Sequence, residues 1–213
     1  MKEKIKISTS ANGPLIVKNL KQITEANGNI FSVDKLTVAL CRCGESKNKP
    51  FCDGTHGRIG WTDEKQEGRQ PRKADNYIGK KNTIHDDRGI CSHAGFCTDG
   101  LPKVFQMGVE PWINPDGETI EQIIETIKKC PSGALSYSVD GKLNNKFSEQ
   151  PEVQITKDGP ILVKGTIELN DDDHPESEDH YALCRCGKSR NKPFCDGQHW
   201  YHKFRDEGRM KIS

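Results

Sequence analysis

The nine cysteines of this chain fall into three sets of three, and two of these sets are copies of one pattern. Each copy reads C-x-C-x8-C-x3-H, with Cys41, Cys43, Cys52 and His56 in the first and Cys184, Cys186, Cys195 and His199 in the second. Three thiolates and one imidazole can hold either a structural zinc ion or an iron–sulfur cluster. The ligand types alone therefore leave both chemistries open.

The repetition extends beyond the ligands, because residues 41–56 and 184–199 differ at only three of 16 positions. Both segments resemble the CDGSH iron–sulfur motif of mitoNEET-like proteins, C-x-C-x2-S/T-x3-P-x-C-D-G-S/A/T-H. The first copy satisfies every position, and the second departs only at Gln198, where a small residue is usual. The resemblance implies a [2Fe–2S] cluster held by three cysteines and one histidine in each copy. A bulkier amide beside the ligand is expected to alter hydrogen bonding or solvent access there.

The histidine ligand that this resemblance implies has redox consequences. A neutral imidazole in place of a thiolate makes the cluster less negative, which raises its reduction potential. The second ring nitrogen can exchange a proton, so potential and pH become coupled. We expect acid-labile clusters at both sites, with potentials that change between about pH 6 and pH 9.

The third set, Cys91, Cys97 and Cys130, matches a bacterial ferredoxin run, C-x2-C-x2-C-x3-C-P, from which ligands are missing. Ala94 stands at the second cysteine position, and Leu101-Pro102 falls where the fourth Cys-Pro would be. The remote Cys-Pro is Cys130-Pro131. Three cysteines bind three irons directly. Either the fourth iron is absent, or His93, water or hydroxide occupies its open position.

This region resembles the divergent single-cluster ferredoxin domains, which carry C-x-H-A-G-x-C, then P-W-I, then C-P-S-G-A-L. The corresponding residues here are 91–97, 111–113 and 130–135. The family implies a [4Fe–4S] cluster. Because Ala94 has no ligating atom, we expect [3Fe–4S] in the isolated protein, with interconversion to [4Fe–4S]. His85, His174, His180 and His202 have no spacing that suggests a role.

Short strands are predicted to deliver the repeated ligands. Gly-Pro turns precede the apolar runs 15–18 and 161–164, and the runs 36–40 and 181–183 lead directly into the cysteines. Asp53 and Asp196 are expected to cap a helix through their side chains, and Gly54 and Gly197 permit a tight backbone beside them. Isoleucines at i, i+3, i+4 and i+7 predict a helix over 120–127.

These elements predict three small units: a first CDGSH module (1–68), a divergent ferredoxin-like middle segment (75–140) and a second CDGSH module (150–213). The fold class is small α+β to mostly β, with a ferredoxin-like α+β domain inserted between the modules. Polar connectors at 64–76 and 140–151 read as solvated linkers. CDGSH domains with one motif per chain form homodimers. The two copies are therefore expected to pair within one chain about a pseudo-two-fold axis, which gives a monomer.

Composition excludes several classes of protein. Lys+Arg 32 against Asp+Glu 31 gives a net charge of +1, which argues against nucleic acid and anionic membranes as partners. The chain lacks an apolar run long enough to span a membrane, and its N-terminus lacks the apolar core of a secretory signal. We expect a cytoplasmic protein. An apolar fraction of 32% over three small units indicates that each cluster also stabilises its own unit.

The predicted function is electron transfer by an iron–sulfur protein that is not an enzyme. Its expected cofactors are two [2Fe–2S] clusters and one [3Fe–4S] or [4Fe–4S] cluster, and its partners are redox proteins or apo-acceptors of clusters. Cluster storage or transfer, and redox or pH sensing, are the alternatives. The remaining alternative is a protein that mediates interactions and whose small units are stabilised by zinc ions.

Overall fold

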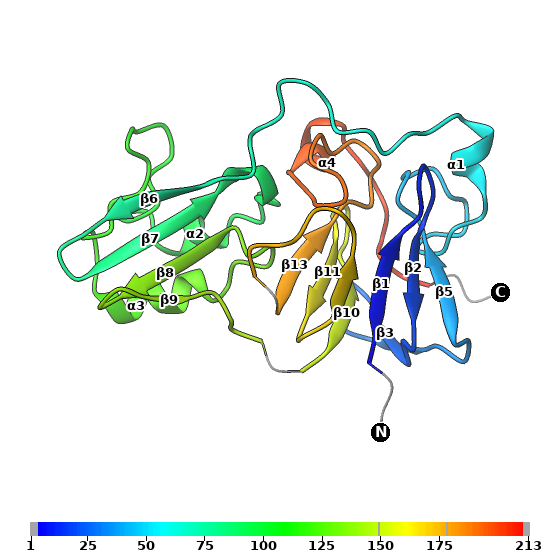
Figure 1. Cartoon of the computed structure of the whole chain (residues 1–213), viewed down its shortest axis with the longest axis horizontal. Coiled ribbons are helices and arrows are strands. Elements are labelled where there is room, and N and C mark those ends of the chain that lie inside the picture. Colours follow the sequence, from blue (N-terminus) through cyan, green and yellow to red (C-terminus); the bar gives the residue numbers. More distant parts are fainter. Residues whose placement is uncertain (1–3, 149, 178, 211–213) are drawn as a thin grey trace.

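Three β-sheets and a few short helices make up the chain in this computed structural model, which describes residues 4–148, 150–177 and 179–210 (Figure 1). Residues 1–3 and 211–213, the outer ends of the two expected CDGSH modules, lie outside the described residues, as do 149 and 178. The architecture is mixed α/β and mostly β. None of the helices in the described part of the chain is long and apolar enough to cross a membrane.

Each of the two sheets at the right of Figure 1 is built from both ends of the sequence. The first has the order β12-β1-β2-β5 and the second the order β13-β11-β10-β3-β4. The strands from the first module are β1 (Lys6–Thr9), β2 (Leu15–Lys18), β3 (Gln22–Thr24), β4 (Ile30–Ser32) and β5 (Thr37–Leu40). Those from the second module are β10 (Glu152–Ile155), β11 (Ile161–Lys164), β12 (Glu168–Asn170) and β13 (His180–Leu183).

The two modules exchange strands reciprocally. Strand β12 of the second module pairs in parallel with β1, and β3 of the first module pairs in parallel with β10. Their buried side chains form one shared core, in which Leu15, Val17 and Leu40 of the first module join Ile161, Val163 and Leu183 of the second. The two modules therefore bury their apolar residues together.

The middle segment has its own sheet and helices. The sheet runs β6 (Ala74–Ile78), β7 (Asn82–Asp87), β8 (Leu135–Val139) and β9 (Lys142–Asn144), with every neighbouring pair antiparallel. A 3-10 turn, η1 (Arg88–Ile90), and the helices α2 (Phe96–Gly100) and α3 (Ile120–Ile127) complete it. This part lies beside β13, β11 and β10, away from β2 and β5 (Figure 1).

The strongest local predictions are confirmed. Helix α3 spans 120–127 and begins with a capping box between Thr119 and Gln122. The strands after both Gly-Pro turns and before both cysteine pairs are present as β2, β11, β5 and β13.

The connectors differ from the prediction of solvated linkers. Strand β9 lies within 140–151. In the other connector the Arg72 guanidinium is largely buried, where it pairs with Asp87 (Nε–Oδ2 2.9 Å) and Asp173 (Nη1–Oδ1 2.9 Å). A connector that forms buried ion pairs fixes the position of the middle segment. Its composition did not reveal this because the partners lie elsewhere in the chain.

Candidate metal centres

Each CDGSH loop presents its four predicted ligands as two pairs. In the first module the Sγ atoms of Cys41 and Cys43, directly after β5, lie 3.7 Å apart, and Cys52 Sγ lies 3.4 Å from His56 Nδ1. In the second module the corresponding distances are 3.8 Å between Cys184 and Cys186 and 3.4 Å between Cys195 and His199. The structure thus brings together the predicted donors in both copies, with Nδ1 as the ring nitrogen nearest the thiol.

These distances suit one tetrahedral metal atom for each pair. Two thiolates bound to one metal at about 2.3 Å lie about 3.8 Å apart, and a thiolate and an imidazole nitrogen lie about 3.6 Å apart. No group of three or more His, Cys, Asp or Glu side chains among the described residues is arranged around a single ion. The two donors of each pair are thus spaced as two ligands of one metal atom.

The Asp of each motif holds the loop closed and does not cap the helix as predicted. Helix α1 (Thr55–Arg58) has Gly54 as its N-cap, at φ +81°, so Asp53 lies one residue before the cap. Its carboxylate accepts hydrogen bonds from Thr55 N (3.0 Å) and Lys47 N (2.9 Å), which ties the two arms of the loop together. Asp196 does the same before α4 (Gln198–Tyr201), with Arg190 N at 2.9 Å.

Sequence reasoning missed the arginine between the paired cysteines. Arg42 is buried, its Nε donates to Gly13 O (2.9 Å), and its Nη2 pairs with Asp63 (2.5 Å). In the second module Arg185 donates to Gly159 O (2.9 Å) and pairs with Asp206. Each guanidinium therefore ties its cysteine pair to the Gly-Pro turn that precedes β2 in the first module or β11 in the second. The signal was available, because an arginine and an aspartate recur at the same offset in both copies.

The thiols of each C-x-C pair share a hydrogen bond. This hydrogen bond lowers the pKa of one thiol in each pair, Cys43 in the first copy and Cys184 in the second, because the neighbouring thiol donates to its sulfur. One thiolate of each pair is thus available near neutral pH for a metal.

The two CDGSH loops differ in exposure. Cys195 and His199 are 2% and 5% exposed, whereas Cys52 and His56 are half-buried and adjoin an exposed helix end. Burial lowers the pKa of His199 to about 4, so this imidazole is neutral at physiological pH, as a metal ligand must be. Identical ligand patterns therefore stand in different environments.

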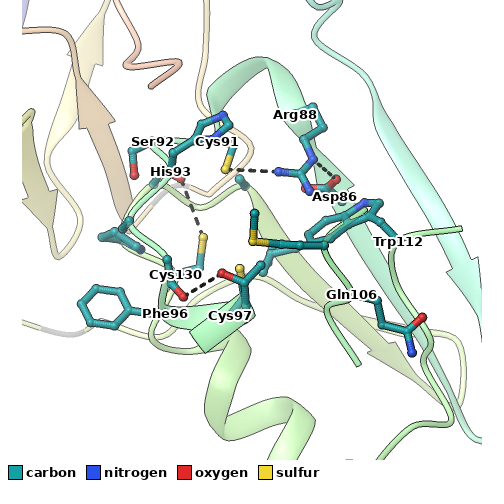
Figure 2. Close-up of a pocket in the computed structure, with 18 of the residues that line it drawn as sticks. Asp86, Arg88, Cys91, Ser92, His93, Phe96, Cys97, Gln106, Trp112 and Cys130 are labelled. Carbon is teal, nitrogen blue, oxygen red and sulfur yellow. Dashed lines mark hydrogen bonds and ion pairs between the residues drawn. The ribbon is translucent and has the colours of Figure 1, made fainter. Parts of the chain in front are cut away.

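The third set of cysteines lines one cavity of about 510 Å³. Cys91 follows η1, Cys97 lies in α2, and Cys130 follows α3, and their sulfurs face a common space (Figure 2). Ala94 also lines this cavity. The structure thus gathers the three predicted thiols around a space with room for a multi-iron cluster.

Burial raises the pKa of Cys91 to about 12 and also raises the pKa of Cys97. A buried thiolate needs nearby positive charge, which iron would supply. Arg88 adds to it, with Nη1 3.6 Å from Cys91 Sγ. The guanidinium is held by Asp86 (Nε–Oδ2 2.9 Å) and lies 3.7 Å from the ring centre of Trp112 (Figure 2). Trp112 of the P-W-I motif therefore orients a cation beside the cavity.

His93, the predicted alternative ligand, packs against the second CDGSH module. A β-carbon on Gly197 would lie 2.8 Å from His93 Cγ and 3.2 Å from its Nε2. In Figure 2 the imidazole turns away from the sulfurs of Cys97 and Cys130. This contact joins two distant motifs, and no local spacing in the sequence indicated it.

Paired thiols and imidazoles in two loops, with three more thiols around a cavity, define a protein that binds metal clusters. The family described as "Iron-binding zinc finger CDGSH type" matches residues 12–57 and 158–200, and the family described as "Divergent 4Fe-4S mono-cluster" matches residues 77–140. The chain belongs to the CDGSH iron–sulfur family and combines two CDGSH regions with a divergent 4Fe-4S mono-cluster domain.

Curated relatives agree with this assignment. "Uncharacterized protein YjdI" of Escherichia coli K12 is 39% identical over 61 residues, which are 29% of this chain and 80% of the relative. "CDGSH iron-sulfur domain-containing protein 2 homolog" of Drosophila ananassae is 37% identical over 34% of this chain and 46% of its own length. "CDGSH iron-sulfur domain-containing protein 1" of Mus musculus is 33% identical over 33% and 59%. No solved structure matches significantly.

Proposed function

We propose that the chain is an electron carrier with two [2Fe–2S] clusters and one [3Fe–4S] or [4Fe–4S] cluster, and that it is not an enzyme. The ligands of the two-iron clusters are Cys41, Cys43, Cys52 and His56 in the first module and Cys184, Cys186, Cys195 and His199 in the second. Cys91, Cys97 and Cys130 hold the third cluster. Each bound cluster takes up and releases single electrons. The proposed units are 1–68, 75–140 and 150–213, with the middle one extended by β9 (Lys142–Asn144).

The arrangement of donors in pairs supports two-iron clusters. Each loop offers two pairs of donors, and each pair is spaced as two ligands of one metal atom, which is what a two-iron cluster with four protein ligands requires. Cys91 and Cys130 also pack against the core shared by the CDGSH modules. This packing of the third cysteine set against the core from which both CDGSH loops extend carries the proposal, because a carrier with several centres needs them close together.

We further propose that the two modules pair within one chain. Gly44 of the first module lies against Cys186 of the second, and Gly187 lies against Cys43 in return. This reciprocity and the exchange of β3 and β12 are what a two-fold relation between the copies requires. The proposed electron acceptors are redox proteins, and they bind this protein as a monomer.

Anaerobic purification followed by iron and sulfide counts, visible spectra and EPR tests the proposal. Four irons from the CDGSH loops and three or four from the middle segment are expected. The EPR signal of an oxidised three-iron cluster distinguishes [3Fe–4S] from [4Fe–4S]. Zinc without acid-labile sulfide would overturn the whole assignment.

Delivery of clusters is a second candidate, favoured by the exposure of the first CDGSH site. Its Cys52 and His56 are half-buried, whereas the equivalent pair in the second module is buried. Incubation with an apo-ferredoxin should therefore remove the cluster of the first CDGSH site before that of the second. The His56→Cys variant should slow the loss of the first cluster. Electron exchange without any cluster transfer would contradict cluster delivery and leave electron transfer as the one proposed function.

A further inference from the structure

One contact joins the cavity of the middle segment to the second CDGSH loop. His93 lies two residues after Cys91, and Gly197 lies two residues after Cys195 and two before His199. The imidazole occupies the space where a side chain at position 197 would stand. A cysteine of one site and two ligands of another are therefore linked through a single packed contact.

Other contacts hold this junction in place. Asn191, in the second CDGSH loop, donates from Nδ2 to Gly89 O (2.8 Å), two residues before Cys91. The Arg72 guanidinium, paired with Asp87, lies 4.7 Å from the ring centre of Phe194. Asn191 is buried, whereas its counterpart Asn48 is exposed. The middle segment thus docks on the second loop at several points around His93.

In the part of the chain that the structure describes, the equivalent glycine of the first loop has no such neighbour. A β-carbon on Gly54, the counterpart of Gly197, would meet only Arg58 Nη1 at 3.8 Å among the described residues. Yet the two glycines have the same conformation, with φ +81° and +82°. The difference between them comes from the docked middle segment and not from the loop itself.

We propose that His93 is the bridging residue through which single electrons pass between the cluster of the middle segment and that of the second CDGSH module. The rate of electron transfer falls steeply across gaps that no atoms fill. The contact between His93 and Gly197 fills the space between the segment that carries Cys91 and the segment that carries Cys195 and His199. One electron leaves one cluster and enters the other, with no bond made or broken. The contact of Gly44 with Cys186 then continues the route to the first module. The inference rests on the proposed carrier function.

Matched glycine variants test this route. Gly197→Ala forces the imidazole out of its place, whereas Gly54→Ala imposes the same backbone strain in open space. His93→Asn removes the ring, and asparagine tolerates the positive φ of +55° at this position. Each protein is loaded anaerobically, its iron and sulfide are counted, and a substoichiometric amount of dithionite is added. Freeze-quench EPR then follows how electrons redistribute between the middle cluster and the two-iron clusters.

Gly197→Ala and His93→Asn are expected to slow redistribution by an order of magnitude or more, with unchanged midpoint potentials, while Gly54→Ala behaves as wild type. Unchanged rates in both variants with full cluster content would overturn the role of His93 and leave the carrier function standing. Loss of the middle cluster in His93→Asn, with normal redistribution in Gly197→Ala, would make His93 a ligand and overturn the inference. Wild-type protein that shows no redistribution would overturn the carrier function itself.

Discussion

Replacing Gly44 with alanine should separate the two CDGSH modules. A β-carbon at this position would lie 2.8 Å from the carbonyl carbon of Cys186, and this neighbour is backbone that cannot move aside. The residue also has a φ of +84°, which costs a side chain about 1–2 kcal/mol. With the added overlap, we expect a loss of about 3 kcal/mol or more in the free energy of unfolding. Urea unfolding of the loaded protein measures it, and visible absorption should fall for both two-iron sites.

Gly28→Ala is the matched control for Gly44→Ala. Gly28 has a φ of +86°, and a β-carbon there would meet nothing within 4 Å. This variant should show only the backbone cost of about 1–2 kcal/mol. Equal losses in the two variants would contradict the proposed pairing of the modules. Wild-type protein should have the mass of one chain, 23.9 kDa, since a mass of twice that would place the pairing between chains.

The ligands and the short elements beside them could be predicted because their residue spacing lies within one continuous stretch of sequence. The C-x-C pairs follow strands, and the isoleucines of α3 lie on one face, because both patterns depend on neighbours a few residues away. Pairing of β12 with β1 and of β3 with β10 could not be read this way. Short strands of similar composition carry little information about which distant strand they join.

The unequal surroundings of the two CDGSH loops were also hidden from sequence analysis. Residues 41–56 and 184–199 are nearly identical, yet among the described residues His93 of the middle segment packs against Gly197 and leaves its counterpart Gly54 open. The residues that cause this, His93 and Arg72, lie in the middle segment and its connector. His93 was expected only as a possible ligand of the middle cluster, and Arg72 lies in a polar stretch that is typical of solvated linkers.

The low apolar fraction takes on a different meaning in the structure. Three small units were expected, each stabilised by its own cluster, with the two CDGSH copies paired. In the structure the CDGSH modules share one core, and a second core belongs mainly to the middle segment. Cys130 packs against both cores. Pooling two modules around one interior raises the fraction of apolar surface that each can bury.

Replacing Arg42 with alanine should destabilise the first module and release its cluster. The side chain of Arg42 is 1% exposed, and its removal leaves Asp63 unpaired and takes a donor from the Gly13 carbonyl. The Ser10 carbonyl loses one of its two donors and keeps the Gly13 N–H (2.9 Å). Removing one partner of a buried ion pair costs about 3–5 kcal/mol. Because Arg42 stands between Cys41 and Cys43, the loss of this anchor also frees the cysteine pair. Urea unfolding and loss of visible absorption at the first site measure the two effects.

Two further variants separate the geometry of Arg42 from its charge. Arg42→Lys keeps the charge but cannot reproduce the forked hydrogen bonds, so it should recover only part of the stability. Arg58→Ala removes a 64%-exposed arginine 3.9 Å from Asp53 in the same loop, and should cost at most about 1 kcal/mol. Similar losses for Arg58→Ala and Arg42→Ala would show that the buried guanidinium does not anchor the loop. A large loss in Arg42→Ala alone means that the cysteine pair depends on a buried charge as well as on its metal.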